Sequence, residues 1–139
     1  MALRKTLDYA DLDILVCDDD ALILQIMERL LTAMGIVNLY TTGSPKTALQ
    51  LLKEPAAKPF DIFICDWMMP EMTGLDMLRK IRASGMDTAF IMLTGQTSSD
   101  AVTEAAAEGV DAYIGKPFTA EEVQQKISVV ANRVLRGKS

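Results

Sequence analysis

The sequence contains no histidine, only two cysteines and no long apolar run. The absence of histidine excludes Ser-His-Asp and Cys-His catalysis, zinc sites built on histidine, and a phosphohistidine carrier. Cys17 and Cys65 each lie in an apolar run typical of a strand, so we expect buried free thiols in a reducing compartment. Residues 1–13 contain no apolar stretch suited to a signal peptide, and no segment approaches the ~20 apolar residues of a membrane span. These absences predict a cytoplasmic protein without a membrane partner.

Net charge and chain length bear on the possible functions and on the number of domains. The net charge of −5, from 14 basic and 19 acidic residues, argues against non-specific nucleic-acid binding, which needs clustered lysine and arginine. The basic residues near the C-terminus, Arg133, Arg136 and Lys138, are too few to change that expectation. With 139 residues, 50% of them apolar, the chain fits one globular domain that needs no disulfide or structural metal.

Short apolar runs alternate along the chain with segments of helical periodicity. Strands are predicted at residues 13–17, 39–41, 60–66, 89–94 and 112–115. Helices are predicted at about residues 21–34, 45–53, 75–83 and 98–109, and after Thr119, which fits a capping box with Glu122. Because the strand runs show no polar alternation, they indicate a parallel sheet covered by helices on both faces. The residues therefore predict an α/β fold with no linker or repeat that would divide it.

Polar residues end four of the predicted strands. They are Asp18, Asp19 and Asp20 after the first strand, then Asp66, Thr94 and Lys116. In open parallel sheets the ligand site lies beyond the carboxyl ends of the strands. Carboxylates brought together there repel one another, and Mg²⁺ relieves the repulsion because it prefers oxygen ligands and binds carboxylates together with phosphate. A metal, a lysine, a hydroxyl and a nucleophilic carboxylate are the parts of a phosphoryl-transfer site, which is the function predicted here.

Each of these residues also has an ordinary structural interpretation when it is taken alone. The run of three aspartates could be a solvated turn that caps the next helix, and Asp66 could be a turn residue. Lys116, which precedes a proline, could be a solvated surface lysine, and Thr94 alone carries almost no information. Four such features at the ends of strands in one parallel sheet favour a shared site over separate explanations.

Four segments resemble the receiver domain of two-component response regulators. They are ILVCDDD at 14–20, DIFICDWMMPEMTGLDMLRKIR at 61–82, FIMLTG at 90–95 and AYIGKPF at 112–118. The resemblance implies a flavodoxin/CheY-like fold, a doubly wound five-stranded parallel sheet of order 2-1-3-4-5 with helices on both faces. It also implies a lead-in at residues 1–10, a receiver domain at 11–136 and a tail at 137–139.

The resemblance further implies roles for the acidic residues. Asp66 would accept a phosphoryl group from a sensor histidine kinase or a histidine phosphotransfer protein. Asp19 would ligate Mg²⁺ directly and Asp18 through water. Asp66 itself and the backbone carbonyl of Met68 would complete the protein's share of the metal shell.

The resemblance also implies that other residues contact the phosphoryl group or respond to it. Lys116 would pair with its oxygens, the Thr94 hydroxyl would reach it, and Tyr113 would turn inward in response. This switch would reshape a protein-binding face that is read by a downstream target, which the sequence does not identify. An aromatic residue at the sheet edge often only packs, so a structural role for Tyr113 stays open.

Two positions bear on phosphate lifetime in the family without fixing it here. Met68 and Gln96 stand where side chains of family members border the path of the attacking water. The methionines of the same loop, Met68, Met69 and Met72, are expected to pack around the site, because thioethers suit soft metals and not Mg²⁺.

Three other classes of protein fit the residues less well. A haloacid-dehalogenase-like phosphohydrolase would use Asp18 and Asp20, but Leu22 stands where threonine or valine is expected and Asp66 would be unused. A P-loop at Gly109–Lys116 has five residues between its glycines instead of four, and Pro117 replaces the serine or threonine. A pseudo-receiver that binds partners without phosphorylation is disfavoured by the complete residue set.

The expected output is a changed protein–protein contact. The resemblance ends near Leu135 and leaves no room for a further domain within this sequence, so a stand-alone regulator is expected. A fragment of a larger regulator is the alternative.

Overall fold

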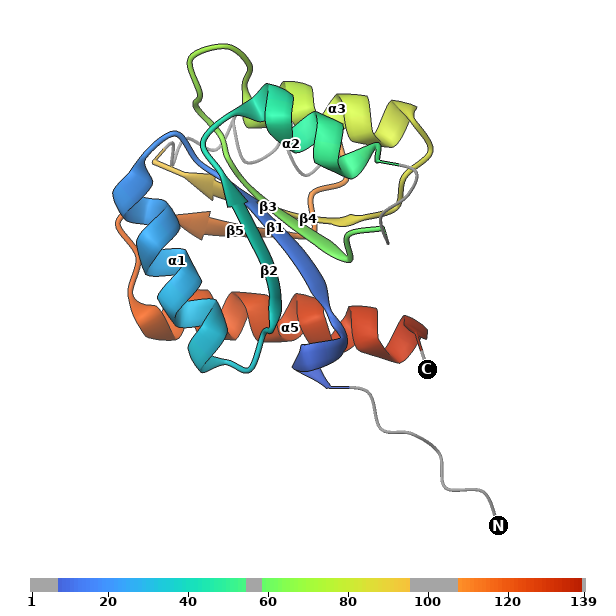
Figure 1. The fold of residues 1–139 in the computed structure, drawn as a ribbon. Helices are drawn as coiled ribbons and strands as arrows, with labels where there is room; N and C mark the ends of the chain where they lie inside the picture. Colours follow the sequence, from blue (N-terminus) through green and yellow to red (C-terminus); the bar gives the residue numbers. More distant parts are fainter. Residues whose placement is uncertain (1–7, 55–58, 96–107, 139) are drawn as a thin grey trace.

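The structure, a computed structural model, describes residues 8–54, 59–95 and 108–138. These residues form a five-stranded sheet in the order β2-β1-β3-β4-β5 (Figure 1). The strands are β1 Asp13–Cys17, β2 Asn38–Thr42, β3 Ile62–Asp66, β4 Ala89–Thr94 and β5 Ala112–Gly115. All neighbouring strands are parallel, so their carboxyl ends share one edge. The predicted doubly wound fold with strand order 2-1-3-4-5 is confirmed.

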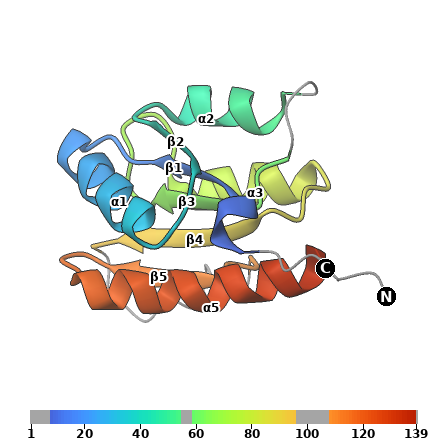
Figure 2. The ribbon, with the colours of Figure 1, turned by 60° about the horizontal axis from the view of Figure 1, so that its bottom comes forward.

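Helices cover both faces of the sheet (Figures 1 and 2). They are α1 Ala21–Ala33, α2 Pro45–Leu52, α3 Gly74–Ala83 and α5 Ala120–Lys138, and a short 3₁₀ helix, η1 Tyr9–Asp11, precedes β1. One hydrophobic cluster joins the sheet to α1 and α5, and a second joins it to α2 and α3. The helix predicted at residues 98–109 lies outside the described residues, except for its last two.

The central strands are buried on both faces, which explains their unbroken apolar sequences. In β1, Ile14 and Val16 join the cluster on the α1 and α5 side, whereas Leu15 and Cys17 join the cluster on the α2 and α3 side. Every residue of β3 and β4 is buried. The edge strand β2 is more exposed and carries polar residues at its ends. Its apolar signal is therefore weak, and the prediction of residues 39–41 missed one residue at each end.

Local signals set the helix starts close to the predicted positions. Asp20 is the N-cap of α1, and its carboxylate accepts a 2.9 Å hydrogen bond from the Leu22 N–H. The helix ends one residue before Met34, and Gly35 follows with a φ of 101°. The positive φ suits glycine, which has no Cβ to clash in this conformation. Thr119 accepts a hydrogen bond from the Glu122 N–H at 3.1 Å, one half of the predicted capping box.

β3 begins at Ile62, two residues later than predicted. Asp61 stands just before it, and its carboxylate accepts a 2.8 Å hydrogen bond from the Asp13 N–H. The same oxygen accepts a hydrogen bond from the Lys138 ammonium at 3.1 Å, so the end of α5 is attached to the amino edge of the sheet.

None of the helices in the described ranges has the length and apolarity needed to cross a bilayer.

Candidate functional site

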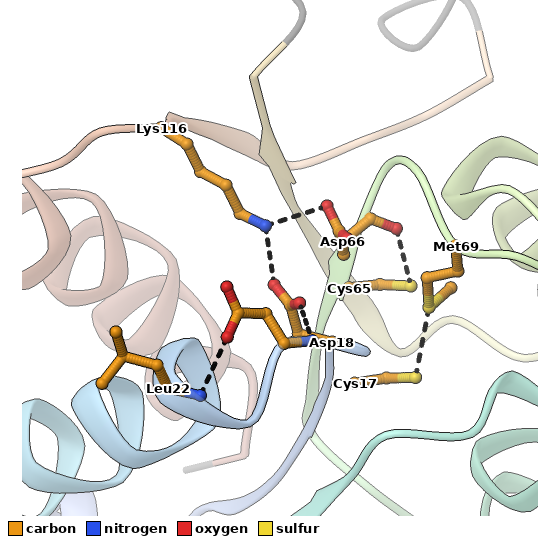
Figure 3. A network of polar contacts seen from close by, with 8 residues as sticks. Cys17, Asp18, Leu22, Cys65, Asp66, Met69 and Lys116 are labelled. Carbon is orange, nitrogen blue, oxygen red and sulfur yellow. Dashed lines mark hydrogen bonds and ion pairs between the residues drawn. The ribbon is translucent and has the colours of Figure 1, made fainter.

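The side chains of Asp18, Asp66 and Lys116 meet at the carboxyl edge of the sheet. Asp18 follows β1, Asp66 ends β3 and Lys116 follows β5. The Lys116 ammonium donates to Asp18 Oδ2 at 2.8 Å and to Asp66 Oδ1 at 3.1 Å (Figure 3). Asp18 is fully buried and Asp66 is 6% exposed. Three strands that are distant in sequence thus supply one charged cluster.

Asp19 adds a third carboxylate from the solvent side of this cluster. One oxygen each from Asp18, Asp19 and Asp66 lies within 4.8 Å of the other two. Oxygen ligands of one Mg²⁺, bound at about 2.1 Å, lie no more than about 4.2 Å apart, so the observed spread needs little adjustment. Three carboxylates against one ammonium also leave an excess of negative charge that suits a divalent cation. The donor set therefore fits Mg²⁺.

The two partners of the ion pair have raised pKa values for different reasons. Burial raises the pKa of Asp66, and the charge of Asp18 adds to the effect. Hydrogen bonds from Lys116 and from the Met68 backbone N–H act in the opposite direction but are outweighed. Burial alone would lower the pKa of Lys116, yet the hydrogen bonds to Asp18 and Asp66, together with the negative charges of these carboxylates, outweigh burial and raise it. Lys116 is therefore held in its charged form, whereas its positive charge does not fully offset the effects of burial and of Asp18 on Asp66.

The third aspartate of the acidic run has a structural task. Asp20 caps α1, as described above, and its backbone N–H donates to Asp18 Oδ1 at 2.9 Å. Both oxygens of Asp18 are thus engaged, one by this N–H and the other by Lys116. The capping interpretation of the acidic run holds for Asp20, and the cluster contains only Asp18 and Asp19 from that run.

Thr94 and Tyr113 lie on the neighbouring strands β4 and β5. Thr94 is 5% exposed, and its carbonyl accepts a 2.8 Å hydrogen bond from the Lys116 N–H. Tyr113 is half-buried and packs against the cluster on the α2 and α3 side, where burial raises its pKa. The register pairs Tyr113 with Met92, two residues before Thr94. Gln96 lies outside the described residues.

The loop from β3 to α3 shapes the other side of the cluster. Met68 is 56% exposed, whereas Met69 is 7% exposed. The Gly74 N–H donates to the Trp67 carbonyl at 2.7 Å, which folds the loop back over the end of β3. A Cβ on Gly74 would lie 2.6 Å from the Asp66 carbonyl oxygen, so only glycine fits this approach.

Comparison with known proteins identifies the family. Residues 14–128 match the response regulator receiver domain. The chain belongs to the response regulator receiver domain family. It is 37% identical to the chemotaxis protein CheY of Pseudomonas aeruginosa over 123 residues, which cover 87% of this chain and 97% of that protein. It is 34% identical to the chemotaxis protein CheY-3 of Vibrio cholerae over 126 residues, 89% of this chain and 95% of that protein.

Solved structures agree with this assignment. A Francisella response regulator 1452 receiver domain superposes with a TM-score of 0.80 at 28% identity, over 88% of this receiver domain chain and 98% of the other. The Vibrio cholerae chemotaxis regulator CheY4 superposes with a TM-score of 0.77 at 28% identity, over 86% of this chain and 98% of the other. The predicted resemblance to receiver domains is therefore confirmed.

Within this receiver domain, sequence reasoning missed the role of Gly74. The available signal was a glycine at the first position of a helix, directly after the Thr73 N-cap. Glycine is a poor helix former, so its presence there indicates a steric requirement. The requirement comes from the Asp66 carbonyl and the Met92 side chain, which belong to two different strands.

Proposed function

We propose that this receiver domain accepts a phosphoryl group on Asp66 from the phosphohistidine of a sensor histidine kinase or a histidine phosphotransfer protein. The observation that carries the proposal is the meeting of Asp18, Asp66 and Lys116 at the carboxyl edge of the sheet. A carboxylate oxygen of Asp66 attacks phosphorus, and the phosphorus–nitrogen bond of the donor breaks. The histidine nitrogen keeps the bonding electron pair, and an acyl phosphate forms on Asp66.

The other residues of the cluster have separable tasks. Lys116, already within hydrogen-bond distance of Asp66, offers its positive charge to the phosphoryl oxygens. The carboxylates of Asp18, Asp19 and Asp66 and the backbone carbonyl of Met68 would hold Mg²⁺, which supplies the positive charge that lets an anionic donor approach. Burial and the charge of Asp18 both raise the pKa of Asp66. A bound cation would favour the ionised carboxylate, which is the form that acts as a nucleophile.

Output is proposed to follow from a switch at Thr94 and Tyr113. The Thr94 hydroxyl would contact the phosphoryl group, and Tyr113 would move inward from its half-buried position at β5. The reshaped face would bind a protein target. The protein would act in the cytoplasm, and its only catalysis would be its own phosphorylation and dephosphorylation.

Two alternative functions predict different outcomes. A pseudo-receiver would bind its partner without phosphorylation, and it would have no use for a third carboxylate beside the ion pairs of Lys116 with Asp18 and Asp66. A haloacid-dehalogenase-like phosphohydrolase would need Asp20 for proton transfer. The carboxylate of Asp20 is engaged as the N-cap of α1, which weighs against that function.

The test is phosphorylation by a small donor. The protein is incubated with Mg²⁺ and acetyl phosphate or a phosphoramidate, and intact mass is measured with and without EDTA. Trp67, which is 9% exposed and adjacent to Asp66, gives a fluorescence readout on addition of a beryllofluoride mimic. A Mg²⁺-dependent mass gain of one phosphoryl group, lost in Asp66→Asn, is expected.

Asp20→Asn is the matched control, because asparagine also serves as an N-cap. It should be phosphorylated like the wild type, whereas Asp19→Asn should need more Mg²⁺. No adduct with any donor would leave the pseudo-receiver as the function. Turnover of a phosphomonoester that is abolished in Asp20→Asn would instead support the phosphohydrolase.

A further inference from the structure

Three sulfur-bearing side chains gather directly beneath the acidic cluster. Cys17 and Cys65 are the residues before Asp18 and Asp66, and they are partners in the register of β1 and β3. The Cys17 Sγ lies 3.5 Å from the Sδ of Met69 (Figure 3). The Cys65 thiol interacts with Cys17 and lies 3.4 Å from the carbonyl oxygen of Asp66. Two thiols and one thioether, from two strands and a loop, therefore share one small region.

This region has the properties of an interior metal site rather than of a reactive thiol pair. Both cysteines are fully buried and free of any disulfide, and Met69 is 7% exposed. Both thiols are therefore shielded from oxidants in the solvent. Thiols and thioethers together select soft cations such as Cu(I), whereas the oxygen cluster above them suits Mg²⁺.

We propose that Cys17, Cys65 and Met69 form a binding site for a soft monovalent metal ion, with Cu(I) as the fitting ion. Metal–sulfur bonds of about 2.3 Å place three trigonally arranged sulfurs about 4 Å apart. The 3.5 Å separation of Cys17 and Met69 is within about half an ångström of that value. This pair of sulfurs therefore needs only a small expansion to hold the ion.

Charge and coordination number both suit a monovalent ion. One thiol releases its proton to water as Cu(I) binds, and the resulting thiolate and the cation together carry the same net charge as the neutral thiol. A divalent ion such as Zn²⁺ would be balanced by two thiolates, but it takes four ligands, one more than these three sulfurs supply. Met69 is the least buried of the three residues and lies on the β3–α3 loop, so this loop is the route of entry.

The proposal is tested by anaerobic titration of the protein with Cu(I) held by a chromogenic chelator. Wild type should withdraw one equivalent from the chelator and show thiolate-to-copper absorption in the ultraviolet. Trp67, which packs in the same cluster, should lose fluorescence on binding. Cys17→Ala and Cys65→Ala should abolish the withdrawal, and Met69→Leu should weaken it by at least about tenfold.

Met86→Leu is the matched control, because Met86 packs against the same hydrophobic cluster but follows α3, at the opposite edge of the sheet. It should bind Cu(I) like the wild type, and circular dichroism verifies that every variant is folded. Absence of binding by folded wild type overturns the proposal. If Cys17→Ala or Met69→Leu binds Cu(I) as tightly as the wild type, the proposal is overturned as well, because the ion would then lie elsewhere.

Discussion

Lys116 contacts Asp18 more closely than it contacts Asp66, at 2.8 Å and 3.1 Å. Asp18 is also the more buried of the two carboxylates. The lysine therefore has a structural task in the absence of ligands, in addition to its proposed role toward the phosphoryl group. It balances a carboxylate that has no access to water.

Replacing Lys116 should destabilise the protein when Mg²⁺ is absent. Lys116→Met leaves the buried carboxylate of Asp18 without its cation. We expect a loss of about 2 kcal/mol in EDTA, less than for a fully buried pair because the Lys116 side chain is 23% exposed. Chemical denaturation in EDTA and in Mg²⁺ measures the effect, and Mg²⁺ should recover part of it. Lys80→Met, at an exposed position of α3, is the control, and equal losses in both variants would refute the explanation.

Asp66→Asn should stabilise the Mg²⁺-free protein at neutral pH. The pKa of Asp66 is raised from 3.8, first by burial and then by Asp18, so the folded state holds the proton more tightly than the unfolded state. The resulting stability is present below the unfolded pKa and is lost as pH rises through the folded pKa. Urea denaturation in EDTA at several pH values tests this: the wild type should lose stability above pH 3.8, and Asp66→Asn should lose less. Identical pH profiles for the two proteins would contradict it.

Gly74→Ala should distort the loop that follows Asp66. The new Cβ would lie 2.6 Å from the Asp66 carbonyl oxygen and 2.7 Å from the Met92 Sδ. Overpacking of this kind costs about 1–3 kcal/mol, and phosphorylation by a small donor should slow because the acceptor moves. Gly43→Ala is the control, since its nearest neighbour, the Asp18 carbonyl oxygen, would be 3.7 Å away. Thermal unfolding of both variants measures this cost. If the Tm of Gly74→Ala equals that of the wild type, the loop accommodates the added methyl group and the prediction is wrong.

Thr94→Val should separate phosphorylation from its readout. Valine keeps the volume of this buried side chain but lacks the hydroxyl, whereas Thr94→Ser keeps the hydroxyl. We expect Thr94→Val to be phosphorylated roughly tenfold more slowly, because one hydrogen bond to the transferring group is missing. Its Tyr113 ring should then show no phosphorylation-dependent change by NMR, while Thr94→Ser retains the change. A full Tyr113 response in Thr94→Val would assign the switch to another contact.

The sequence predicted the fold because its signals are local and consistent. The β1, β3 and β4 runs are apolar on both faces, and this pattern is produced by a covered parallel sheet. Helices α1 and α2 begin after Asp20 and Ser44, residue types that favour helix N-caps, and these side chains accept hydrogen bonds from backbone N–H groups. The predicted bounds of β2 were one residue short at each end, because its ends carry no apolar residues that would mark them as strand.

Sequence alone determined which residues reach the carboxyl edge of the sheet, because strand ends are marked by where apolar runs stop. It did not separate Asp20 from Asp18 and Asp19, since three consecutive aspartates look alike until the helix start assigns one of them to a cap. Nor did it show that Lys116 pairs with Asp18 in the absence of ligands, or that Cys17, Cys65 and Met69 adjoin. Those contacts depend on distances between segments far apart in the chain, which only the packed sheet and its loops establish.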